Sequence, residues 1–434
     1  MTTELLQQVR VINPLNTTDE VADVLIEDGY IKSVNQKISD IDNALIHDCQ
    51  SLILGPGLVD LYSHSGEPGF EERETVASFL KAAYTGGFTR VAVLPNTSPS
   101  IDNPAVVAQL QQLYKNSSQD SSQDSNQNLN QNSSSLPLLN LWGAITKDVK
   151  GEKMTELADL KNAGIVGFAD GDALNNLALV RRVLEYLQPL RKPAAFWCCD
   201  RNISADGIMR EGADSIQWGL PGNPSASETS AIAALLELVA STFTPIHIMR
   251  VSTARSVELI EDAKAKGLPV TASTTWMHLL LDTSSVKTYH TALNLEPPLG
   301  NPRDMMALRR GVRQGILDAI AIDHSPFTYE EKTVAFAQAP PGAIGLELAL
   351  PLLWQNLVET GEFSALELWK ALSSNPAECL KQSPSRIEAG EKAELTLFNP
   401  QENWKVESKN LHSLSNNTPW FGKELTGKVV RIWC

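Results

Sequence analysis

Eight short apolar runs, each ending in polar residues, constrain the fold of this chain more than any other feature. In chain order the runs are Ile53–Tyr62, Thr89–Asn96, Asn140–Thr146, Gly164–Gly171, Pro193–Asp200, Pro245–Thr253, Pro269–Thr275 and Asp318–Pro326. Most are followed by an amphipathic helical pattern, as in Ser230–Ala240 and Val257–Lys266. Strand followed by helix, repeated eight times, predicts an α/β protein with a (β/α)8 TIM barrel over residues 56–388. The chemistry of such a barrel is located at the carboxyl ends of its strands.

Short β-prone runs separated by turn residues lie near both ends of the chain. They are Val9–Ile12, Ala22–Glu27, Tyr30–Val34 and Leu52–Leu54, and then Ala393–Phe398, Trp404–Glu407 and Lys428–Trp433. These runs predict one small composite β-sandwich, built from residues 1–55 and 389–434 beside the barrel.

One segment, Asn116–Ser135, consists almost entirely of Ser, Asn, Gln and Asp, with Leu129 as its single apolar residue. Such a segment buries too little apolar surface to offset the entropy lost on ordering. We therefore predict a disordered polar loop over residues 116–135.

The composition is that of a soluble globular protein, with 434 residues of which 42% are hydrophobic. A net charge of −15 argues against nucleic acid or an anionic membrane as a partner. No 18-residue apolar stretch is present, and the first ten residues lack the pattern of a signal peptide. The five cysteines show neither metal-binding nor disulfide spacing, which favours a reducing cytoplasm.

The end of the first run reads Gly55-Pro-Gly-Leu-Val-Asp-Leu-Tyr-Ser-His-Ser-Gly-Glu-Pro-Gly69. It resembles the opening motif of the dihydroorotases in the amidohydrolase superfamily, P-G-x-x-D-x-H-x-H-x-R-E-P-G. Further matching segments are Val93–Thr97, Gly219–Gly222, Val251–Thr253, Ile322–Pro326, Ala339–Gly342 and Asn417–Trp420. The resemblance thus covers nearly the whole chain and implies a barrel with a composite β-sandwich.

The departures from the family pattern fall at metal-binding and substrate-binding positions. Three positions that the resemblance assigns to metal-binding histidines hold Tyr62, Trp197 and Arg250. The substrate-binding arginine of the first motif is Gly66, and the family's N-P-P-L-R segment begins here with Glu296 and ends with Gly300. Hydrolysis of a cyclic amide in this family needs a metal-bound hydroxide, a polarised carbonyl and a carboxylate that moves the proton.

Three of the six implied metal-ligand positions are retained, namely His64, Asp170 and Asp323. They are the candidate remnant of one metal site, with Asp323 also the remnant of the catalytic proton shuttle. The second ion keeps only the shared Asp170, which cannot hold a metal alone. We therefore expect no cofactor, with a single zinc ion as the alternative.

Arg250 is expected to form an ion pair with Asp170 or Asp323, where it would supply the positive charge of the missing metal and repel an incoming cation. Tyr62 and Trp197 would fill the volume that metal, water and substrate require. A structural role of His64 as a hydrogen-bonded core histidine is the alternative to metal binding.

Two further residues are candidate remnants of substrate contacts. Asn96 could orient a carboxylate or cap the following helix, and both interpretations remain open. His324 could serve packing or a supporting hydrogen bond. Adjacent Cys198 and Cys199 point to opposite faces of a strand, so burial as small hydrophobic residues is favoured over a thiol nucleophile.

Three functions fit these observations. The first is that of the inactive dihydroorotase-like subunits of some bacteria, which assemble with the catalytic subunit of aspartate transcarbamoylase; a homo-oligomer within that assembly is then expected. The second is an active mono-zinc amidohydrolase that cleaves a cyclic amide. The third is a small-molecule binding protein that uses the remaining pocket. Only the first explains why metal ligands and substrate ligands are lost together.

Overall fold

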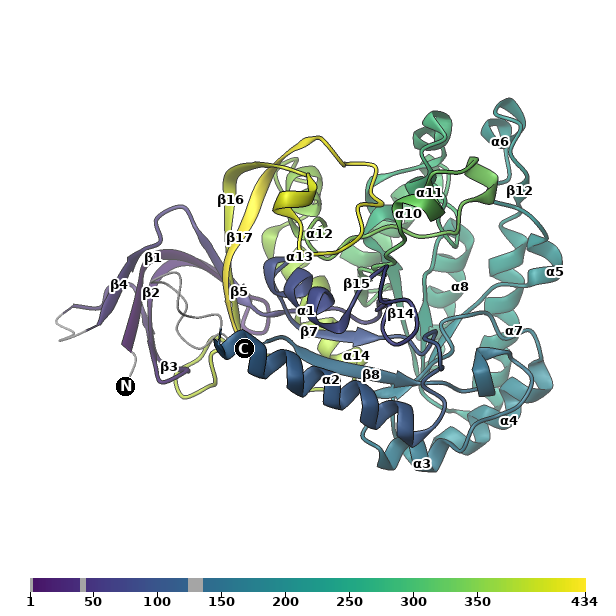
Figure 1. Ribbon diagram of the computed structural model, residues 1–434, viewed down its shortest axis with the longest axis horizontal. Helices are drawn as coiled ribbons and strands as arrows, with labels where there is room; N and C mark the ends of the chain where they lie inside the picture. Colours follow the sequence, from purple (N-terminus) through teal and green to yellow (C-terminus); the bar gives the residue numbers. More distant parts are fainter. Residues whose placement is uncertain (1–2, 40–43, 124–135) are drawn as a thin grey trace.

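A closed barrel of eight parallel strands forms the centre of the computed structural model, which describes residues 3–39, 44–123 and 136–434 (Figure 1). The strands are β6 (Leu58–Val59), β7 (Phe88–Val93), β8 (Leu138–Gly143), β9 (Gly167–Phe168), β10 (Ala195–Trp197), β13 (Ile246–Met249), β14 (Val270–Thr275) and β15 (Ala319–Ala321). Each lies in or overlaps one of the eight apolar runs.

Hydrogen bonds close the barrel in two places. The strands pair in the orders β6-β7-β8-β9 and β10-β13-β14-β15. A parallel bridge between Phe168 and Ala194 joins the two groups on one side. On the other side the amide of Asp323 donates to the carbonyl of Tyr62, and the amide of His64 donates to the carbonyl of His324. The TIM barrel predicted from the apolar runs is confirmed.

Helices cover the outside of the barrel. The longer ones are α1 (Val76–Thr85), α2 (Pro104–Gln123), α4 (Leu177–Leu187), α7 (Ala226–Thr242), α8 (Ala254–Ala265), α10 (Pro302–Arg313) and α13 (Ala365–Leu372). Shorter elements are α3 (Leu157–Asn162), α5 (Arg201–Ser204), β11 (Met209–Arg210), α6 (Ala213–Gln217), β12 (Gly222–Asn223), α9 (Trp276–Leu280), α11 (Tyr329–Lys332), α12 (Ala349–Leu353) and α14 (Ser374–Cys379). Over the described residues, no helix combines the length and apolarity that a membrane span requires.

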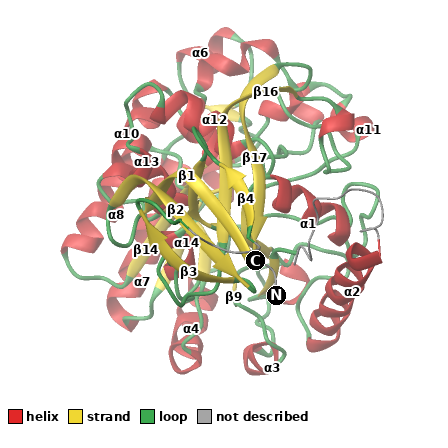
Figure 2. Ribbon diagram, turned by 90° about the vertical axis from the view of Figure 1, so that its left-hand side faces the viewer, coloured by secondary structure: helices red, strands yellow, loops and turns green. Residues whose placement is uncertain are grey.

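Both ends of the chain contribute to one seven-stranded sheet at the side of the barrel (Figures 1 and 2). Its strands are β1 (Thr3–Asn13), β2 (Thr18–Glu27), β3 (Tyr30–Asn35), β4 (Leu45–Asp48), β5 (Ile53–Pro56), β16 (Leu395–Lys405) and β17 (Glu424–Trp433). The order is β17-β16-β5-β1-β2-β3, with β4 paired to β1. The two ends of the chain do combine as predicted, but their strands form one continuous sheet. The predicted sandwich would have divided them between two sheets. Because β5 leads directly into β6, the sheet is tied to the first strand of the barrel.

The predicted polar loop at 116–135 begins inside helix α2, which continues to Gln123, so the first part of that prediction is wrong. Polar side chains here bond within the helix: Ser117 Oγ donates to the carbonyl of Leu113, and Gln112 Nε2 donates to Asn116 Oδ1. Residues 124–135 of the predicted loop lie outside the described part of the chain.

Candidate functional site

A cavity of about 260 Å³ opens at the carboxyl ends of the barrel strands. Residues that follow or end seven of the eight strands line it, namely His64, Asn96, Gly171, Trp197, Arg250, Thr275 and Asp323. A TIM barrel places its functional site at this face. This cavity is therefore the candidate functional site.

The side chain of Arg250 lies across the centre of this site. Its Nε and Nη2 donate to the two carboxylate oxygens of Asp323 at 2.8 and 2.7 Å. Nη1 donates to the carbonyl of Gly171 at 2.8 Å, and Nη2 lies 3.2 Å from His64 Nε2. The Arg250 side chain is 6% exposed, so this is a nearly buried, bidentate ion pair. The predicted pairing of Arg250 with Asp323 is thus observed.

The contact with Arg250 determines the protonation of His64. Since a guanidinium nitrogen can only donate, His64 Nε2 must accept, and the proton of the neutral ring is on Nδ1. Burial, followed by the charge of Arg250, lowers the pKa of His64 to about 4. Its Nε2 lies 3.8 Å from Asp323 Oδ1, with the guanidinium in contact with both groups. His64 is therefore a neutral partner of the ion pair.

Asp170 is turned away from this cluster, which corrects its predicted place beside Arg250. Its carboxylate accepts hydrogen bonds from the amides of Ile145 and Thr146 at 2.7 and 2.9 Å, and from Thr146 Oγ1 at 2.5 Å. These three donors hold the Asp170 carboxylate outside the cavity. The neighbouring residue Gly171 lines the cavity, and Asp170 does not. Burial raises the pKa of Asp170 to about 6, against the opposing effect of these hydrogen bonds.

The donor set does not fit the metal centre that the resemblance implies. Of the three retained ligand positions, only His64 and Asp323 face each other, and Asp170 bonds elsewhere. Over the described residues, no group of three His, Cys, Asp or Glu side chains is arranged to hold an ion. A guanidinium in contact with both remaining candidates also opposes a cation electrostatically. The expected three-ligand remnant of one site is therefore not formed.

Tyr62 connects the base of the site to the barrel core. The amide of Arg250 donates to the Tyr62 hydroxyl at 3.0 Å, and this hydroxyl lies 2.9 Å from Ser273 Oγ. Ser273 Oγ lies 2.8 Å from His247 Nε2, and His247 Nδ1 lies 2.9 Å from Thr271 Oγ1. Tyr62 is fully buried, so it occupies volume inside the barrel and fixes the backbone that carries Arg250.

The two glycines at arginine positions of the family lie in tight backbone surroundings. A Cβ at Gly66 would lie 2.1 Å from the carbonyl oxygen of Phe70, well inside van der Waals contact. A Cβ at Gly300 would lie 2.5 Å from the Cβ of Asp304. Neither position accepts a side chain unless its neighbours move. The local backbone therefore excludes the arginines that the family has at these two positions.

Glu296, at the family's asparagine position, is held by Arg201 at the edge of the cavity. Arg201 Nη1 donates to Glu296 Oε1, and Nη2 donates to Asp172 Oδ1 at 2.7 Å. The Cζ atom of Arg201 lies 4.6 Å from the ring centroid of Trp197. The Cζ atom of Arg250 lies 5.4 Å from the same centroid. Trp197 is thus packed between two cations where the resemblance implies a histidine ligand.

Asn96 lines the cavity, and the alternative that it caps the next helix is wrong. Helix α2 is capped by Asn103, whose Oδ1 accepts from the amides of Ala105 and Val106. Asn96 Oδ1 is buried without a hydrogen-bond partner among the described residues.

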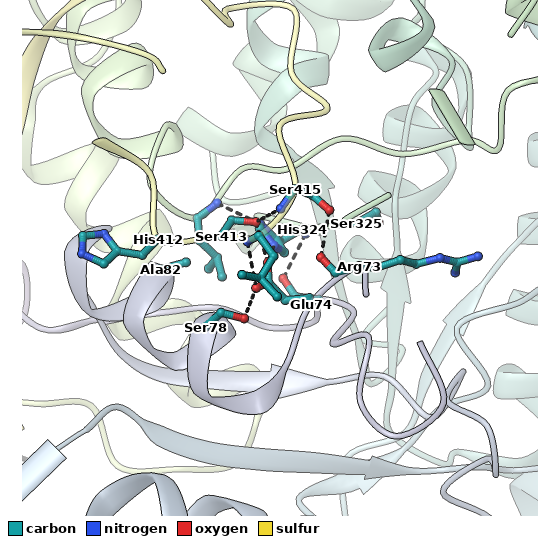
Figure 3. Close-up of polar contacts among 12 residues, drawn as sticks. Arg73, Glu74, Ser78, Ala82, His324, Ser325, His412, Ser413 and Ser415 are labelled. Carbon is teal, nitrogen blue, oxygen red and sulfur yellow. Dashed lines mark hydrogen bonds and ion pairs between the residues drawn. The ribbon is translucent and has the colours of Figure 1, made fainter. Parts of the chain in front are cut away.

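His324 points away from the cavity into a buried network (Figure 3). Its Nδ1 accepts from the amide of Gly345 at 3.1 Å, so Nε2 carries the proton and donates to Glu74 Oε2 at 3.3 Å. Glu74, which is fully buried, also accepts from Ser78 and Ser413. The supporting hydrogen bond expected of His324 is present, and its placement among substrate contacts is wrong.

Sequence reasoning missed two arginines at this site, Arg73 and Arg201. Arg73 lines the cavity between the rings of Phe70 and Phe327, with its Cζ 4.3 and 4.9 Å from their centroids. Its Nε and Nη2 donate to Glu331 at 3.1 and 2.5 Å. The only sequence signal was the aromatic residue three positions before Arg73. Its partners lie about 250 residues away along the chain.

Comparison with known proteins shows the family of this chain. A model described as dihydro-orotase-like matches residues 51–256, and one described as the amidohydrolase family matches residues 227–434. A probable dihydroorotase-like protein of Synechocystis sp. is 41% identical over 99% of both chains. The chain belongs to the dihydroorotase-like family of amidohydrolases. A protein named dihydroorotase from Syntrophus aciditrophicus is 36% identical over 98% of this chain and 96% of its own.

Solved structures of low sequence identity share the fold of this dihydroorotase-like chain. An L-hydantoinase (dihydropyrimidinase) from Arthrobacter aurescens has a TM-score of 0.78 at 20% identity and covers 99% of this chain and 94% of its own. A dihydropyrimidinase from Brevibacillus agri has a TM-score of 0.78 at 19% identity and covers 99% and 93%. At these identities the likeness supports the amidohydrolase-type barrel and no more.

Proposed function

We propose that this chain is a non-catalytic dihydroorotase-like protein of pyrimidine biosynthesis that serves in the cytoplasm as a structural subunit for aspartate transcarbamoylase. One observation carries the first half of this proposal. The guanidinium of Arg250 binds both oxygens of Asp323 and contacts His64, in the place where the family's chemistry needs a metal.

The same ion pair removes the proton shuttle. Asp323 would have to accept a proton from a nucleophilic water, but both of its oxygens already accept from a fixed cation. His64 is neutral, with its Nε2 facing Arg250. No described side chain at this site is then placed to activate water in the way the family does.

The scaffold role is supported by what has been kept. The barrel, the terminal sheet and the buried Glu74 network are complete, although the ligand positions have changed. A fold that is maintained without its chemistry is best explained by an interaction, and this inference is one of analogy. The net charge of −15 favours a partner with a complementary basic patch.

Co-expression with the catalytic chain of aspartate transcarbamoylase from the same organism, followed by size-exclusion chromatography, tests the partner. We expect co-elution at micromolar concentration in a complex larger than either protein. Separate elution, with a fully active transcarbamoylase alone, would contradict the scaffold role.

Metal analysis of the purified chain tests the non-catalytic half independently. We expect less than one zinc per chain after purification without chelator. Two zinc ions per chain would contradict the structural argument, because Trp197 and Arg250 occupy two of the positions needed for the second ion.

A further inference from the structure

A second cavity lies outside the barrel wall, between helices α4 and α7, which pack against each other (Figure 1). Its volume is about 250 Å³. Protein interiors seldom leave voids much larger than one water molecule. An apolar cavity of roughly 150 Å³ already accepts a benzene molecule. The space between these helices is therefore large enough for a small organic ligand.

The position of this cavity follows from the sequences of β10 and α7. Ala195 packs in the cluster inside the barrel, whereas Phe196 and Cys198 pack in the cluster that the barrel shares with its helices. On the opposite side of the cavity, α7 contributes Ala231 and Ala234, whose side chains end at Cβ. Two short side chains facing the outer side of β10 leave the volume unfilled.

Most of the wall is apolar, with side chains from α4, β10 and α7. They include Leu177, Val180, Phe196, Ala231, Ala234 and Leu235. Leu177 is 47% exposed although it lines the cavity, so a ligand would cover apolar surface that now faces water. The hydrophobic effect therefore favours an apolar occupant.

An ion has no suitable partner in this cavity. Among the described residues of the wall, Asp200 is the only charged one, and its Oδ1 accepts from the amides of Asn202 and Ile203 at 2.9 and 3.2 Å. An anion would meet this carboxylate, and a cation would have to compete with the two amides for it. Either ion would also lose hydration against apolar walls.

We propose that the cavity between α4 and α7 is a ligand site for a small uncharged apolar molecule of about the size of a substituted benzene ring. The site lies outside the barrel wall and uses no chemistry at the barrel mouth. It therefore goes beyond the proposed function and does not rest on it.

Binding of 4-fluorotoluene, measured by fluorine NMR, tests this ligand class. We expect saturable binding with a dissociation constant of about 1 mM or below. 4-Fluorobenzoate and 4-fluorobenzylammonium carry the same ring with a charge, and their binding at this site should be at least about tenfold weaker. The absence of saturable 4-fluorotoluene binding would overturn the proposal.

Two substitutions on the same helix locate the binding. Ala234→Phe places a ring in the cavity, whereas Ala233, the preceding residue, does not line it. We expect Ala234→Phe to weaken 4-fluorotoluene binding at least about tenfold and Ala233→Phe to leave it unchanged. Equal effects of the two variants would overturn the proposal. So would a charged analogue that binds as tightly as 4-fluorotoluene and loses that binding in Ala234→Phe alone.

Thiol labelling tests the same cavity in the unsubstituted chain, should Ala234→Phe fail to fold. Cys198 lines the cavity and Cys379 does not, although the two residues are 6% and 9% exposed. Burial raises the pKa of both thiols. Methyl methanethiosulfonate, a small uncharged thiol reagent, should therefore modify Cys198 several-fold faster than Cys379, as measured by peptide mass spectrometry.

4-Fluorotoluene should slow the reaction at Cys198 and leave that at Cys379 unchanged. Equal rates at the two cysteines, or no protection of Cys198 by 4-fluorotoluene, would contradict a ligand site between α4 and α7.

Discussion

At the scale of single residues, the Arg250–Asp323 pair explains most of what distinguishes this site. Both residues adopt positive φ angles, 55° and 51°, in the left-handed region that non-glycine residues seldom occupy. Contacts with surrounding residues must stabilise these conformations. Arg250 lies just after β13, and Asp323 lies just after β15. The ion pair is thus a fixed part of the barrel mouth.

Replacing Arg250 with methionine should strongly destabilise the fold. The variant leaves Asp323, which is 15% exposed, without its cation, and the free energy of unfolding should fall by about 3–5 kcal/mol in urea denaturation. Arg255→Met, at the exposed pair with Glu258, should cost less than about 1 kcal/mol. Equal losses in the two variants would show that the buried pair has no special structural role.

Restoring the family's arginine at position 66 should not restore a substrate site. In Gly66→Arg the new Cβ meets the Phe70 carbonyl at 2.1 Å, so the loop must shift, at a cost of at least about 1–3 kcal/mol. Gly212→Ala is a suitable control, since no atom lies within 4 Å of its Cβ position. Measured by thermal unfolding, a Gly66→Arg variant as stable as this control would refute the packing argument.

Asp170 predicts a defined dependence of stability on pH. The folded protein keeps this proton up to about pH 6, whereas the unfolded chain releases it near 3.8. Between these values the folded state binds more protons, so stability falls as pH rises, by up to roughly 3 kcal/mol. Asparagine does not titrate, so Asp170→Asn should gain stability relative to the parent from about pH 4 to about pH 6.

Urea denaturation at several pH values measures this difference, with Asp159→Asn on α3 as the control for loss of an exposed carboxylate. A stability difference between Asp170→Asn and the parent that is constant over this range would contradict the assignment of a raised pKa to Asp170.

At the scale of elements, the Glu74 network joins parts of the chain that are far apart in sequence. Glu74 precedes α1, His324 follows β15, and Ser413 belongs to the segment between β16 and β17 (Figure 3). The network therefore fixes the C-terminal segment against the barrel mouth.

Glu74→Ala should release this segment. The change leaves the buried donors of His324 and Ser413 and the amide of Leu414 without their acceptor, so the free energy of unfolding should fall by at least about 3 kcal/mol. Limited proteolysis should then cut within residues 411–418 sooner than in the parent. Glu72→Ala, an exposed neighbour, provides the comparison, and identical digestion of the two variants would argue against the network.

The elements also show how far sequence reasoning reaches. The eight barrel strands follow from apolar runs, because burial on both faces dictates their composition. The orientation of Asp170 did not follow, since it depends on three donors from residues 145 and 146 that no motif indicates. The predicted end of helix α2 was too early. The polar side chains near that end bond back to the helix, but by composition alone such a segment resembles a loop.

The site could be predicted in part. The replaced positions at 62, 197 and 250 all lie in the barrel interior or line the cavity, as a family motif would place them. His324 and Glu74 could not be paired from sequence, because 250 residues separate them. Arg73 was missed for the same reason, because its partner Glu331 on α11 is 258 residues away. The partners of Arg201, Asp172 and Glu296, are 29 and 95 residues away and belong to no motif.

At the scale of the whole molecule, the fold of a dihydroorotase-like protein is present, and the Arg250–Asp323 ion pair lies at the mouth of its barrel. The terminal sheet and the barrel strands are in place, and a large buried hydrophobic core packs against them. We propose that such a pattern reflects the interacting role put forward above, which a binding measurement can test.

The most direct test of this account is the rate of dihydroorotate hydrolysis by the purified chain in the presence of added zinc. The protein named dihydroorotase from Syntrophus aciditrophicus, 36% identical to this chain, is the control under the same conditions. The account predicts no turnover above the uncatalysed rate, because Arg250 occupies both oxygens of Asp323. Zinc-dependent turnover comparable to that of the control would contradict it.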